Sequence, residues 1–448
     1  MKLTCQDEIE IQSCLQQLKD KIQSHQAHVG VVGLGYVGLP LAVEFARAGF
    51  TVTGIDIDGR KVRAVNSANS YVQDVPTSVL APLVKSGKLR ATADFSVIAE
   101  MDTVNIAVPT PLNKTKDPDM SYVVKACEEI AKYIHPGMLA ILESTTYPGT
   151  TSELMLPILQ RSGMTVGEDF FLCFSPERVD PGNSQYQTAN IPKVVGGITP
   201  ACTEVGALFY GQAIDKVVPV SSTQVAEMVK LLENTFRLIN IGLANEIALM
   251  CDRIGIDVWE VIDAAATKPF GFMPFYPGPG LGGHCIPIDP FYLSWKTKQA
   301  GIEARFIELA GYINGQMPHF VVDKIQNALN DHSKPLKGSS VHVLGVAYKR
   351  DIDDVRESPA LDIIHLLCKR GADVTYSDPF VSRLRADGIV PRDMESIDPE
   401  VASANADCVV IVTDHKKFNY PRVVERARLI VDTRNALKGF TSEKIVRL

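Results

Sequence analysis

The chain has 448 residues, of which 46% are hydrophobic and 22% are charged. At roughly 100 to 200 residues per domain, this length predicts about two to four globular domains, and the composition excludes disordered and fibrous proteins. The net charge is −7, from 45 basic and 52 acidic residues with no block of lysine or arginine. This balance argues against nucleic-acid partners, and without an apolar run of about 18 residues no membrane span is expected.

Cysteine usage and the N-terminal residues predict a cytoplasmic protein. The nine cysteines are scattered, with no C-x-x-C pair, which is typical of reduced thiols and offers no metal-binding spacing. Acidic residues stand at positions 7, 8 and 10, where a signal peptide would need an apolar run. Apolar residues at helical spacing predict instead an amphipathic N-terminal helix packed on the body: Ile11, Leu15, Leu18 and Ile22.

From His28 to Asp56 the sequence reads as a β-α-β unit. A short apolar strand leads into a glycine turn, a helix that Gly49 stops, and a second strand that ends at Asp56. Strand-like and helical stretches alternate after it, with strands at 103–108, 139–142 and 171–174 and helices at 121–133 and 152–160. This alternation predicts an α/β fold with a parallel sheet covered by helices on both faces.

A weaker copy of this pattern occupies the C-terminal part. SSVHVLGVAYKR reads as a strand and a turn, and Ser358 with the following proline caps the next helix. Gly371 and Asp378 stand seven residues apart, the same spacing as in the first unit. The three positions of the glycine triad are held here by Gly345, Ala347 and Arg350. We therefore predict a second α/β domain whose ligand is not a dinucleotide.

Between the two copies, the run from Ser221 to Arg253 is almost free of glycine and proline. Ser221 and Gln224 have the spacing of a capping box, and Gly255 ends the run. At 1.5 Å per residue this predicts a helix of about 45 Å, which would link the domains and pack against a second subunit. The alternative is a pair of shorter helices broken near Gly242.

The glycine turn of the first unit carries the pattern G-x-G-x-x-G at Gly33, Gly35 and Gly38. It follows a strand, opens a helix, and precedes Asp56 by 23 residues, and this context is typical of a dinucleotide site. The helix start would hold the pyrophosphate, and Asp56 would bind the ribose diol and repel a 2′-phosphate. The turn therefore predicts NAD rather than NADP, although Lys61 places a cation nearby. The alternative is a tight turn without a cofactor.

Three further segments carry chemistry. The glycine-rich loop 278–290 contains Cys285 with His284 and Asp289, which favours a thiol near a ligand over a buried inert thiol. Lys230 and Asn234 lie four apart on one helix face, a pair that suits oxyanion stabilisation but is also common on solvated helices. Polar residues also follow two predicted strands, where a parallel sheet binds ligands or where loops simply cap helices: Glu143, Thr145, Glu177, Arg178 and Asp180.

Together these motifs resemble the UDP-glucose/GDP-mannose 6-dehydrogenase family. The resemblance covers residues 28 to about 439 and rests on GLGYVGLPLA, VPTP, ST followed by proline, K-x-x-x-N, GGHCIPIDP and YKRDIDDVRESPA, in that order. It implies two Rossmann-like doubly wound parallel-sheet domains joined by a long central helix and a helical middle domain. The implied boundaries are an N-terminal helix at 1–26, an NAD-binding Rossmann domain at 27–213, a central helical domain with the cysteine loop at 214–330, and a UDP-sugar-binding domain at 331–448.

The resemblance also implies roles for individual residues. Cys285 would be the nucleophile, with Asp289 beside it, Lys230 and Asn234 would steady the oxyanion, and Thr145 and Glu177 would position substrate and water. The implied cofactor contacts are Gly33, Gly35, Tyr36, Val37, Gly38, Asp56, Lys61, Thr110, Thr145 and Arg356. The implied substrate contacts are Glu177, Arg178, Lys230, Asn234, Tyr276, Gly282, Tyr348 and Lys349.

The resemblance implies a four-electron oxidation of the C6 alcohol of a UDP-sugar to the uronic acid, with two NAD per substrate, no metal and a thioester on Cys285. Such products supply polysaccharide biosynthesis. The segment around Arg178 favours UDP-N-acetylglucosamine, with UDP-N-acetylmannosamine and UDP-glucose as alternatives. The expected assembly is a homodimer or higher homo-oligomer through the central helix. Two other classes remain open: a two-electron β-hydroxyacid-type dehydrogenase, which needs no cysteine, and a non-catalytic NAD-binding regulator.

Overall fold

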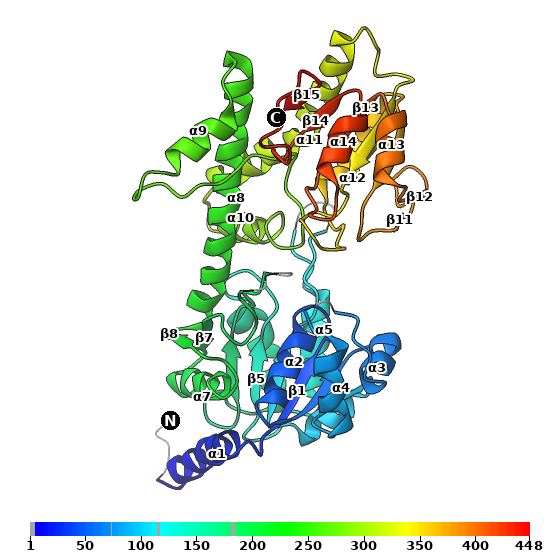
Figure 1. The fold of residues 1–448 in the computed structure, drawn as a ribbon. Helices are drawn as coiled ribbons and strands as arrows, with labels where there is room; N and C mark the ends of the chain where they lie inside the picture. Colours follow the sequence, from blue (N-terminus) through cyan, green and yellow to red (C-terminus); the bar gives the residue numbers. More distant parts are fainter. Residues whose placement is uncertain (1–4, 73, 114–116, 181–182, 184) are drawn as a thin grey trace. The chain divides into compact units, whose positions relative to one another are not determined.

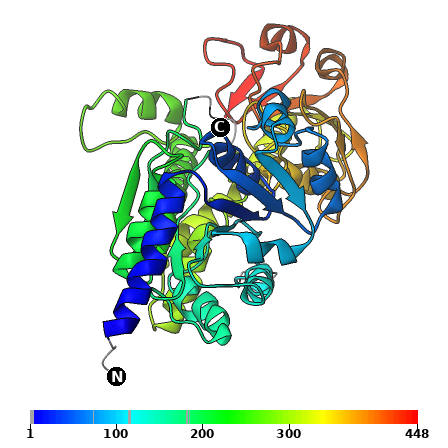
Figure 2. The same cartoon turned by 90° about the horizontal axis from the view of Figure 1, so that it is seen from below.

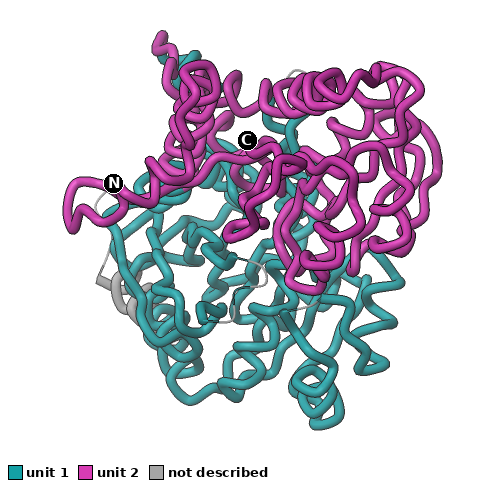
Figure 3. Tube along the Cα trace, turned by 45° about the horizontal axis from the view of Figure 1, so that its top comes forward, with its two compact units in different colours: residues 1–233, 295–300 teal, residues 234–294, 301–448 magenta. Residues whose placement is uncertain are grey.

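The computed structural model describes residues 5–72, 74–113, 117–180, 183 and 185–448. The chain divides into two compact units, coloured separately in Figure 3. Unit 1 comprises residues 1–233 and 295–300, and unit 2 comprises residues 234–294 and 301–448. Each unit is a separate α/β body, and two helices contain residues of both units: α8 (Thr223–Ile254) and α10 (Asp289–Gln299).

Unit 1 is built on an eight-stranded sheet in the order β3-β2-β1-β4-β5-β6-β7-β8 (Figure 1). Its strands are β1 (His28–Val32), β2 (Thr51–Ile55), β3 (Leu89–Thr92), β4 (Thr103–Ile106), β5 (Leu139–Leu142), β6 (Phe171–Phe174), β7 (Lys193–Gly197) and β8 (Val217–Val220). Its helices and turns are α1 (Cys5–Gln23), α2 (Gly38–Arg47), α3 (Gly59–Asn66), α4 (Thr77–Lys85), η1 (Phe95–Glu100), α5 (Ser121–Ala131), η2 (Thr150–Met155), α6 (Leu156–Leu159), η3 (Gln160–Ser162) and α7 (Pro200–Tyr210).

The sheet of unit 1 is buried on both faces, as its continuous apolar strands predict. Along β5, Leu139 and Ile141 face one hydrophobic core, while Ala140 and Leu142 face a second core on the other side. The α/β fold is therefore confirmed. One pairing departs from the predicted parallel sheet, because β7 runs antiparallel to β6. The strands β3, β7 and β8 were not predicted, since all three are short, β3 and β7 are interrupted by charged, polar or glycine residues, and β8 contains a proline.

The predicted N-terminal helix is present as α1, and it packs beside α7 (Figures 1 and 2). Leu18 and Ile22 are buried in the core, and the ammonium of Lys19 pairs with Glu204 of α7 at 2.7 Å. The side chain of Ile11 lies outside the described residues. The helix thus adds its apolar stripe to the core of unit 1.

Unit 2 contains a five-stranded parallel sheet in the order β10-β9-β13-β14-β15. Its strands are β9 (Ser340–Leu344), β10 (Asp373–Ser377), β13 (Cys408–Ile411), β14 (Ile430–Asp432) and β15 (Ile445–Arg447), with a small hairpin of β11 (Arg383–Leu384) and β12 (Met394–Glu395). Its helices are α9 (Val258–Ala265), α11 (Arg305–Asp331), α12 (Pro359–Lys369), α13 (Pro399–Asn405) and α14 (Tyr420–Arg426). The predicted C-terminal copy is therefore a real sheet of the same parallel kind, and the Ser358 hydroxyl caps α12 as expected.

The run between the two sheets forms one helix, α8 (Thr223–Ile254), and not two. The predicted cap residue is wrong by one position: the hydroxyl that accepts from Val225 N belongs to Ser222, at 3.3 Å, and Ser221 lies before the helix. Gly242 does not break the helix. A Cβ there would lie 3.0 Å from Cβ of Ala310 on α11. Its missing side chain lets the two helices approach closely. Among the described helices, none has both the length and the apolar character needed to cross a membrane.

Candidate active site

The glycine turn after β1 has the geometry of a dinucleotide site. Gly33 has a φ of +94°, and a Cβ there would collide with the carbonyl of Ala107. A Cβ on Gly38 would collide with the carbonyl of Gly33, so α2 begins against the turn. Gly35 faces open space: apart from its chain neighbours, the described residues place no atom within 4 Å of a Cβ built there. A pyrophosphate could therefore approach Gly35 and the first N–H groups of α2.

Asp56 ties this turn to the end of β2. One carboxylate oxygen accepts hydrogen bonds from Leu34 N at 2.8 Å and from the Lys61 ammonium at 3.0 Å, and the other accepts from Asp58 N at 2.8 Å. Asp56 is only 6% exposed, whereas the Lys61 side chain is 35% exposed. The pair thus stands at the edge where a ribose is predicted. Sequence reasoning missed Tyr71, whose hydroxyl donates to Leu34 O at 2.6 Å and also holds the turn.

Two predicted cofactor contacts meet beyond the carboxyl ends of β4 and β5. The hydroxyl of Thr110 donates to the carbonyl of Thr145 at 2.8 Å, and the Ser144 hydroxyl donates to Val108 O at 2.7 Å. The neighbouring strands therefore bring these residues together from separate parts of the sequence. Tyr36, which is 48% exposed, and Val37 complete the glycine turn before α2.

Glu177 lies in a buried network after β6. Its Oε1 accepts from Arg178 N at 2.7 Å and Val179 N at 2.8 Å, and its Oε2 lies 3.3 Å from the Lys193 ammonium. Burial alone would raise the pKa of Glu177, but Lys193 and these two backbone donors reverse that effect, so its pKa lies below the usual range. Glu177 is therefore held ionised and oriented.

Lys193, which sequence reasoning missed, also pairs with Glu143 at 2.6 Å. Glu143 is fully buried, accepts from Asn105 at 2.9 Å, and contacts the hydroxyl of Tyr210. Burial raises the pKa of Glu143 in spite of Lys193, while the two carboxylates raise the pKa of Lys193 against its own burial. Glu143 thus lies inside the protein and not in an open site. The only available sequence signal was a lysine at the start of an apolar strand.

The helix α8 carries Lys230 and Asn234 one turn apart, as predicted. Lys230 is 7% exposed, so the solvated-helix alternative is wrong for it, and its charge contributes to the lowered pKa of Glu177. Arg178 pairs with Glu233 at 2.5 Å and donates to Pro192 O at 2.6 Å. Its predicted contact with substrate remains a prediction.

Cys285 stands shortly before α10 (Asp289–Gln299) in unit 2. Its carbonyl accepts from Asp289 N at 2.8 Å and Ile288 N at 3.1 Å, which fixes the loop at the helix start. Cys285 is exposed, so the alternative of a buried inert thiol is wrong. Asp289 is 2% exposed, and its carboxylate accepts from the Asn234 amide at 2.5 Å. Burial, followed by the charge of Arg356, lowers the pKa of His284.

The glycines before Cys285 let Tyr348 pack against the loop. A Cβ on Gly282 would lie 2.6 Å from Cβ of Tyr348, and a Cβ on Gly283 would lie 2.8 Å from its ring. Gly283 N also donates to Arg356 O at 2.9 Å. The predicted substrate residues Gly282, Tyr348 and its neighbour Lys349 therefore lie together. The Arg356 guanidinium pairs with Asp354 at 2.6 Å, and its predicted contact with the cofactor remains a prediction.

Tyr276 lies apart from this cluster, against α9. Its hydroxyl donates to Asp263 at 2.9 Å, and its ring stacks on Trp259 with 5.9 Å between the centroids. Its assignment to the substrate remains a prediction.

Sequence reasoning missed Arg434, which follows β14 and lies against Gly278 of the cysteine loop. Burial and the charge of Arg350 lower the pKa of Arg434 to about 10. Its place after a parallel strand, in LIVDTRN, was the available signal.

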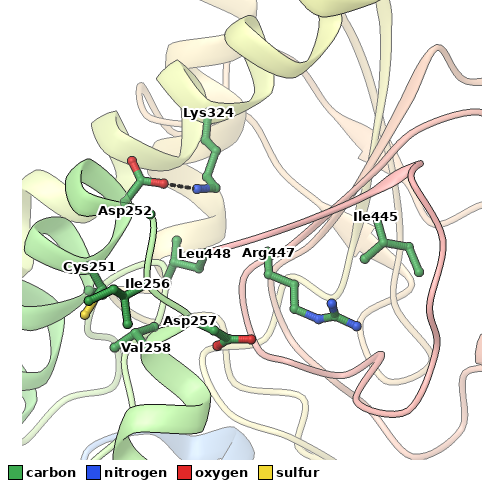
Figure 4. A pocket seen from close by; sticks show the side chains of 11 residues that line it. Cys251, Asp252, Ile256, Asp257, Val258, Lys324, Ile445, Arg447 and Leu448 are labelled. Atoms are coloured by element: carbon green, nitrogen blue, oxygen red, sulfur yellow. Dashed lines mark hydrogen bonds and ion pairs between the residues drawn. The ribbon is translucent and has the colours of Figure 1, made fainter.

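A pocket of about 230 Å³ elsewhere in unit 2 is unrelated to these residues (Figure 4). It lies among the end of α8, the start of α9, α11 and the C-terminus, and an ion pair between Asp252 and Lys324 borders it. Its lining consists of Ala248, Cys251, Asp252, Gly255, Ile256, Asp257, Val258, Lys324, Ile445, Arg447 and Leu448. No predicted site residue is among them, so this pocket is not part of the predicted active site.

The chain belongs to the UDP-glucose/GDP-mannose dehydrogenase family. Residues 27–214 match the family's NAD binding domain, residues 224–316 its central domain, and residues 342–439 its UDP binding domain. These matches confirm the predicted family, the NAD cofactor and the activity of an NAD-dependent UDP-sugar 6-dehydrogenase.

Named relatives cover nearly the whole chain. A UDP-N-acetyl-D-glucosamine 6-dehydrogenase of Salmonella typhi is 35% identical over 88% of this chain and 91% of its own length. Another of the same name, from Pseudomonas aeruginosa, is 38% identical over 79% and 83%. The solved structure of a UDP-D-ManNAc dehydrogenase from Pyrococcus horikoshii has a TM-score of 0.85 at 33% identity, and the match covers 94% of this chain and 98% of that one.

Proposed function

We propose that this protein oxidises the C6 alcohol of UDP-N-acetylglucosamine to the uronic acid through a thioester on Cys285. The observation that carries the proposal is the exposed Cys285 near the start of α10, beside a buried Asn234–Asp289 pair, in a chain with NAD and UDP binding domains. A two-electron dehydrogenase would need none of this cysteine arrangement.

The turn at Gly33, Gly35 and Gly38, with Asp56 and Lys61 at its edge, would hold the cofactor. NAD, when bound there, accepts a hydride in each of the two oxidations. The Cys285 thiolate adds to the C6 aldehyde that the first oxidation leaves, and the second oxidation turns this adduct into a thioester. The covalent bond keeps the sugar bound between the two oxidations. Asn234 and Lys230 would stabilise charge on the C6 oxygen, and Glu177, held ionised by Lys193, would orient the hydrolysing water.

The test is the yield of NADH from UDP-N-acetylglucosamine and the behaviour of Cys285→Ser. The unmutated enzyme should release two NADH per sugar, as a four-electron oxidation requires. Because a serine hydroxyl is a far weaker nucleophile than a thiolate, Cys285→Ser should lower kcat by about 100-fold or more while both ligands still bind. Cys14→Ser on α1 is the matched control and should turn over normally. A yield of one NADH per sugar would instead identify a two-electron dehydrogenase.

Two features support UDP-N-acetylglucosamine as the substrate: the names of the two curated relatives and the presence of Arg178 after β6. UDP-N-acetylmannosamine is the second candidate, because the Pyrococcus horikoshii neighbour is named as a UDP-D-ManNAc dehydrogenase. UDP-glucose is the third. Values of kcat/KM for these three sugars will rank them, and a clear preference for either alternative would replace the first assignment.

We further propose a homodimer, or a higher homo-oligomer, formed through α8. Phe236, Leu243 and Met250 recur every seven residues along the helix and are 46%, 54% and 51% exposed. An apolar stripe of this length on one helix suits a partner helix, and a second copy presents the same stripe. Sedimentation velocity should show the dimer, and Leu243→Glu should weaken it.

We also propose the cytoplasm as the compartment, since the eight cysteines with described side chains form no disulfide.

A further inference from the structure

The segment 346–351, which follows β9 and Gly345, carries the predicted substrate residues Tyr348 and Lys349 but belongs to no helix or strand. A ladder of backbone hydrogen bonds therefore does not fix its position. Tyr348 N donates to Asp354 O at 2.9 Å, and the Tyr348 ring lies against Gly283 of the cysteine loop. The contacts that hold this segment therefore fix the positions of the predicted substrate residues Tyr348 and Lys349. They also fix the Tyr348 ring that lies against the cysteine loop.

The first end of the segment is held by Asp378, which follows β10. One oxygen of this buried carboxylate accepts from Val346 N at 2.8 Å and from Ala347 N at 3.1 Å. The other oxygen accepts from Phe380 N at 2.8 Å and Val381 N at 3.0 Å, which locks the carboxylate to its own loop.

The far end is held by His415, which follows β13. Its Nδ1 lies 2.9 Å from Asp351 N, and because a backbone N–H can only donate, Nδ1 is the acceptor. The ring proton therefore resides on Nε2, which donates to Asp378 at 3.0 Å. The imidazole is fully buried, with the rings of Phe380 and Phe418 at 5.1 and 5.6 Å.

Asp351 itself shows that this end is under constraint. Its φ is +62°, a backbone conformation that residues other than glycine rarely adopt. Its carboxylate accepts from Lys416 N at 3.0 Å, next to His415 in the chain. The hydroxyl of Thr413 donates to Ala347 O at 2.5 Å, so the β13 loop contacts the segment at both ends.

We infer that His415 is a positioning residue of the UDP-sugar site, because the Asp378–His415 pair clamps both ends of the 346–351 segment. This inference deepens the proposed function and rests on it for the identity of the ligand. His415 acts through the segment and does not touch the reacting atoms. Loss of the clamp should therefore weaken UDP binding and raise the KM for the UDP-sugar, with kcat and NAD binding nearly unchanged.

The test is calorimetry with UDP on full-length protein carrying His415→Asn, His415→Gln or His415→Ala. The asparagine amide occupies the place of Nδ1 and can still accept from Asp351 N, whereas the glutamine amide occupies the place of Nε2 and can still donate to Asp378. His415→Ala should weaken UDP binding about tenfold, because the hydrogen bond that orders the segment and the bond to Asp378 are both lost. His415→Asn should retain more UDP affinity than His415→Gln, because the asparagine keeps the bond to the segment. NAD affinity should stay within about twofold in all three.

His342 supplies the matched control. It is also fully buried in unit 2, and its ring nitrogens contact the hydroxyls of Thr375 and Ser377 at 2.9 Å, on β10 and not in residues 346–351. His342→Gln should lower stability but leave UDP affinity unchanged. Unchanged UDP affinity in a folded His415→Ala protein, or an equal loss in His342→Gln, would overturn the inference.

Hydrogen exchange on the unmutated protein covers the case in which His415 variants do not fold. The Asp351 amide should exchange slowly even without UDP, because it donates to a buried imidazole. Exchange as fast as that of an exposed loop amide would contradict the clamp. The proposed function fails by a different result: UDP binds and the clamp behaves as expected, yet no UDP-sugar yields NADH.

Discussion

Both sheets place a glycine with positive φ directly after their first strand, Gly33 at +94° and Gly345 at +82°. A Cβ at either position would collide with a carbonyl beyond the neighbouring strand, that of Ala107 in the first sheet and of Thr413 in the second. Each sheet also ends its next strand with an aspartate that accepts from the glycine turn, Asp56 from Leu34 N and Asp378 from Val346 N, both at 2.8 Å. The two turns therefore begin with the same backbone conformation and the same kind of aspartate contact.

The two turns differ in the residues after this first glycine. In the first turn Gly35 faces open space and α2 begins at Gly38, so the helix start lies at the turn. In the second turn Ala347 is fully buried, and α12 begins only at Pro359. Asp56 pairs with the partly exposed Lys61 ammonium at the edge of the site, whereas Asp378 pairs with the buried imidazole of His415. One topology thus leaves open space for the predicted pyrophosphate in the first sheet, and in the second sheet it holds the loop with the predicted substrate contacts.

The largest expected effect is a loss of stability when the aspartate beside either turn is replaced by asparagine. Asp378→Asn should lower the free energy of unfolding by about 3 kcal/mol, because a buried charge acceptor of several N–H groups and an imidazole is replaced by an amide. Asp56→Asn should cost less, about 1 kcal/mol, since its partners include a Lys61 side chain that can return to water. Urea denaturation of both variants measures the difference, and equal losses would show that the two aspartates are equivalent.

Acid titration sharpens the same contrast. Burial would raise the pKa of Asp378, but the hydrogen bond from His415 and the backbone donors lower it below the ordinary 3.8. A lowered pKa in the folded state contributes stability above 3.8 that is lost as the pH falls through the folded value. The free energy of unfolding should therefore decline less steeply below pH 3.8 in Asp378→Asn than in the unmutated protein.

A second expected effect concerns the open face of the first turn. Gly35→Ala should leave the melting temperature unchanged, because its Cβ meets no described atom beyond the chain neighbours within 4 Å. It should nevertheless weaken NAD binding about tenfold by filling the space of the pyrophosphate, while UDP binding stays normal. Fluorescence titration with NADH measures the loss. Normal NADH affinity in this variant would place the cofactor elsewhere.

The last expected effect, of similar size, is on the choice between NAD and NADP. Asp56→Ala should narrow the preference for NAD over NADP by about tenfold, because the acceptor for the ribose diol is lost and Lys61 becomes available to a 2′-phosphate. Adding Lys61→Ala should remove the gain with NADP. Ratios of kcat/KM for the two cofactors provide the measurement, and an unchanged ratio in Asp56→Ala would assign the discrimination to another residue.

Several strands, the glycine turn and the long helix could be predicted from the sequence, because each depends on residues that are close together in the chain. The apolar strands β1, β4, β5 and β6, the glycine turn and the long helix α8 follow from periodicity and punctuation within short windows. Strand β7 was missed, since its antiparallel pairing with β6 depends on a distant segment and not on its own five residues. Ser222 replaced Ser221 as the cap because a helix start is defined only once its first hydrogen bonds form.

The sequence by itself determined the family, the cofactor and the identity of the cysteine loop, because motifs such as GLGYVGLPLA and GGHCIPIDP carry their chemistry in adjacent residues. Only the tertiary structure decided which isolated residues act with them. Lys193 between Glu143 and Glu177, Arg434 beside Gly278, and His415 between Asp378 and Asp351 are single polar residues with no local pattern. Arg434 and His415 lie in loops that parallel strands bring to one edge of a sheet, whereas Lys193 meets Glu177 because β7 runs antiparallel to β6. Burial then makes each charge and hydrogen bond matter.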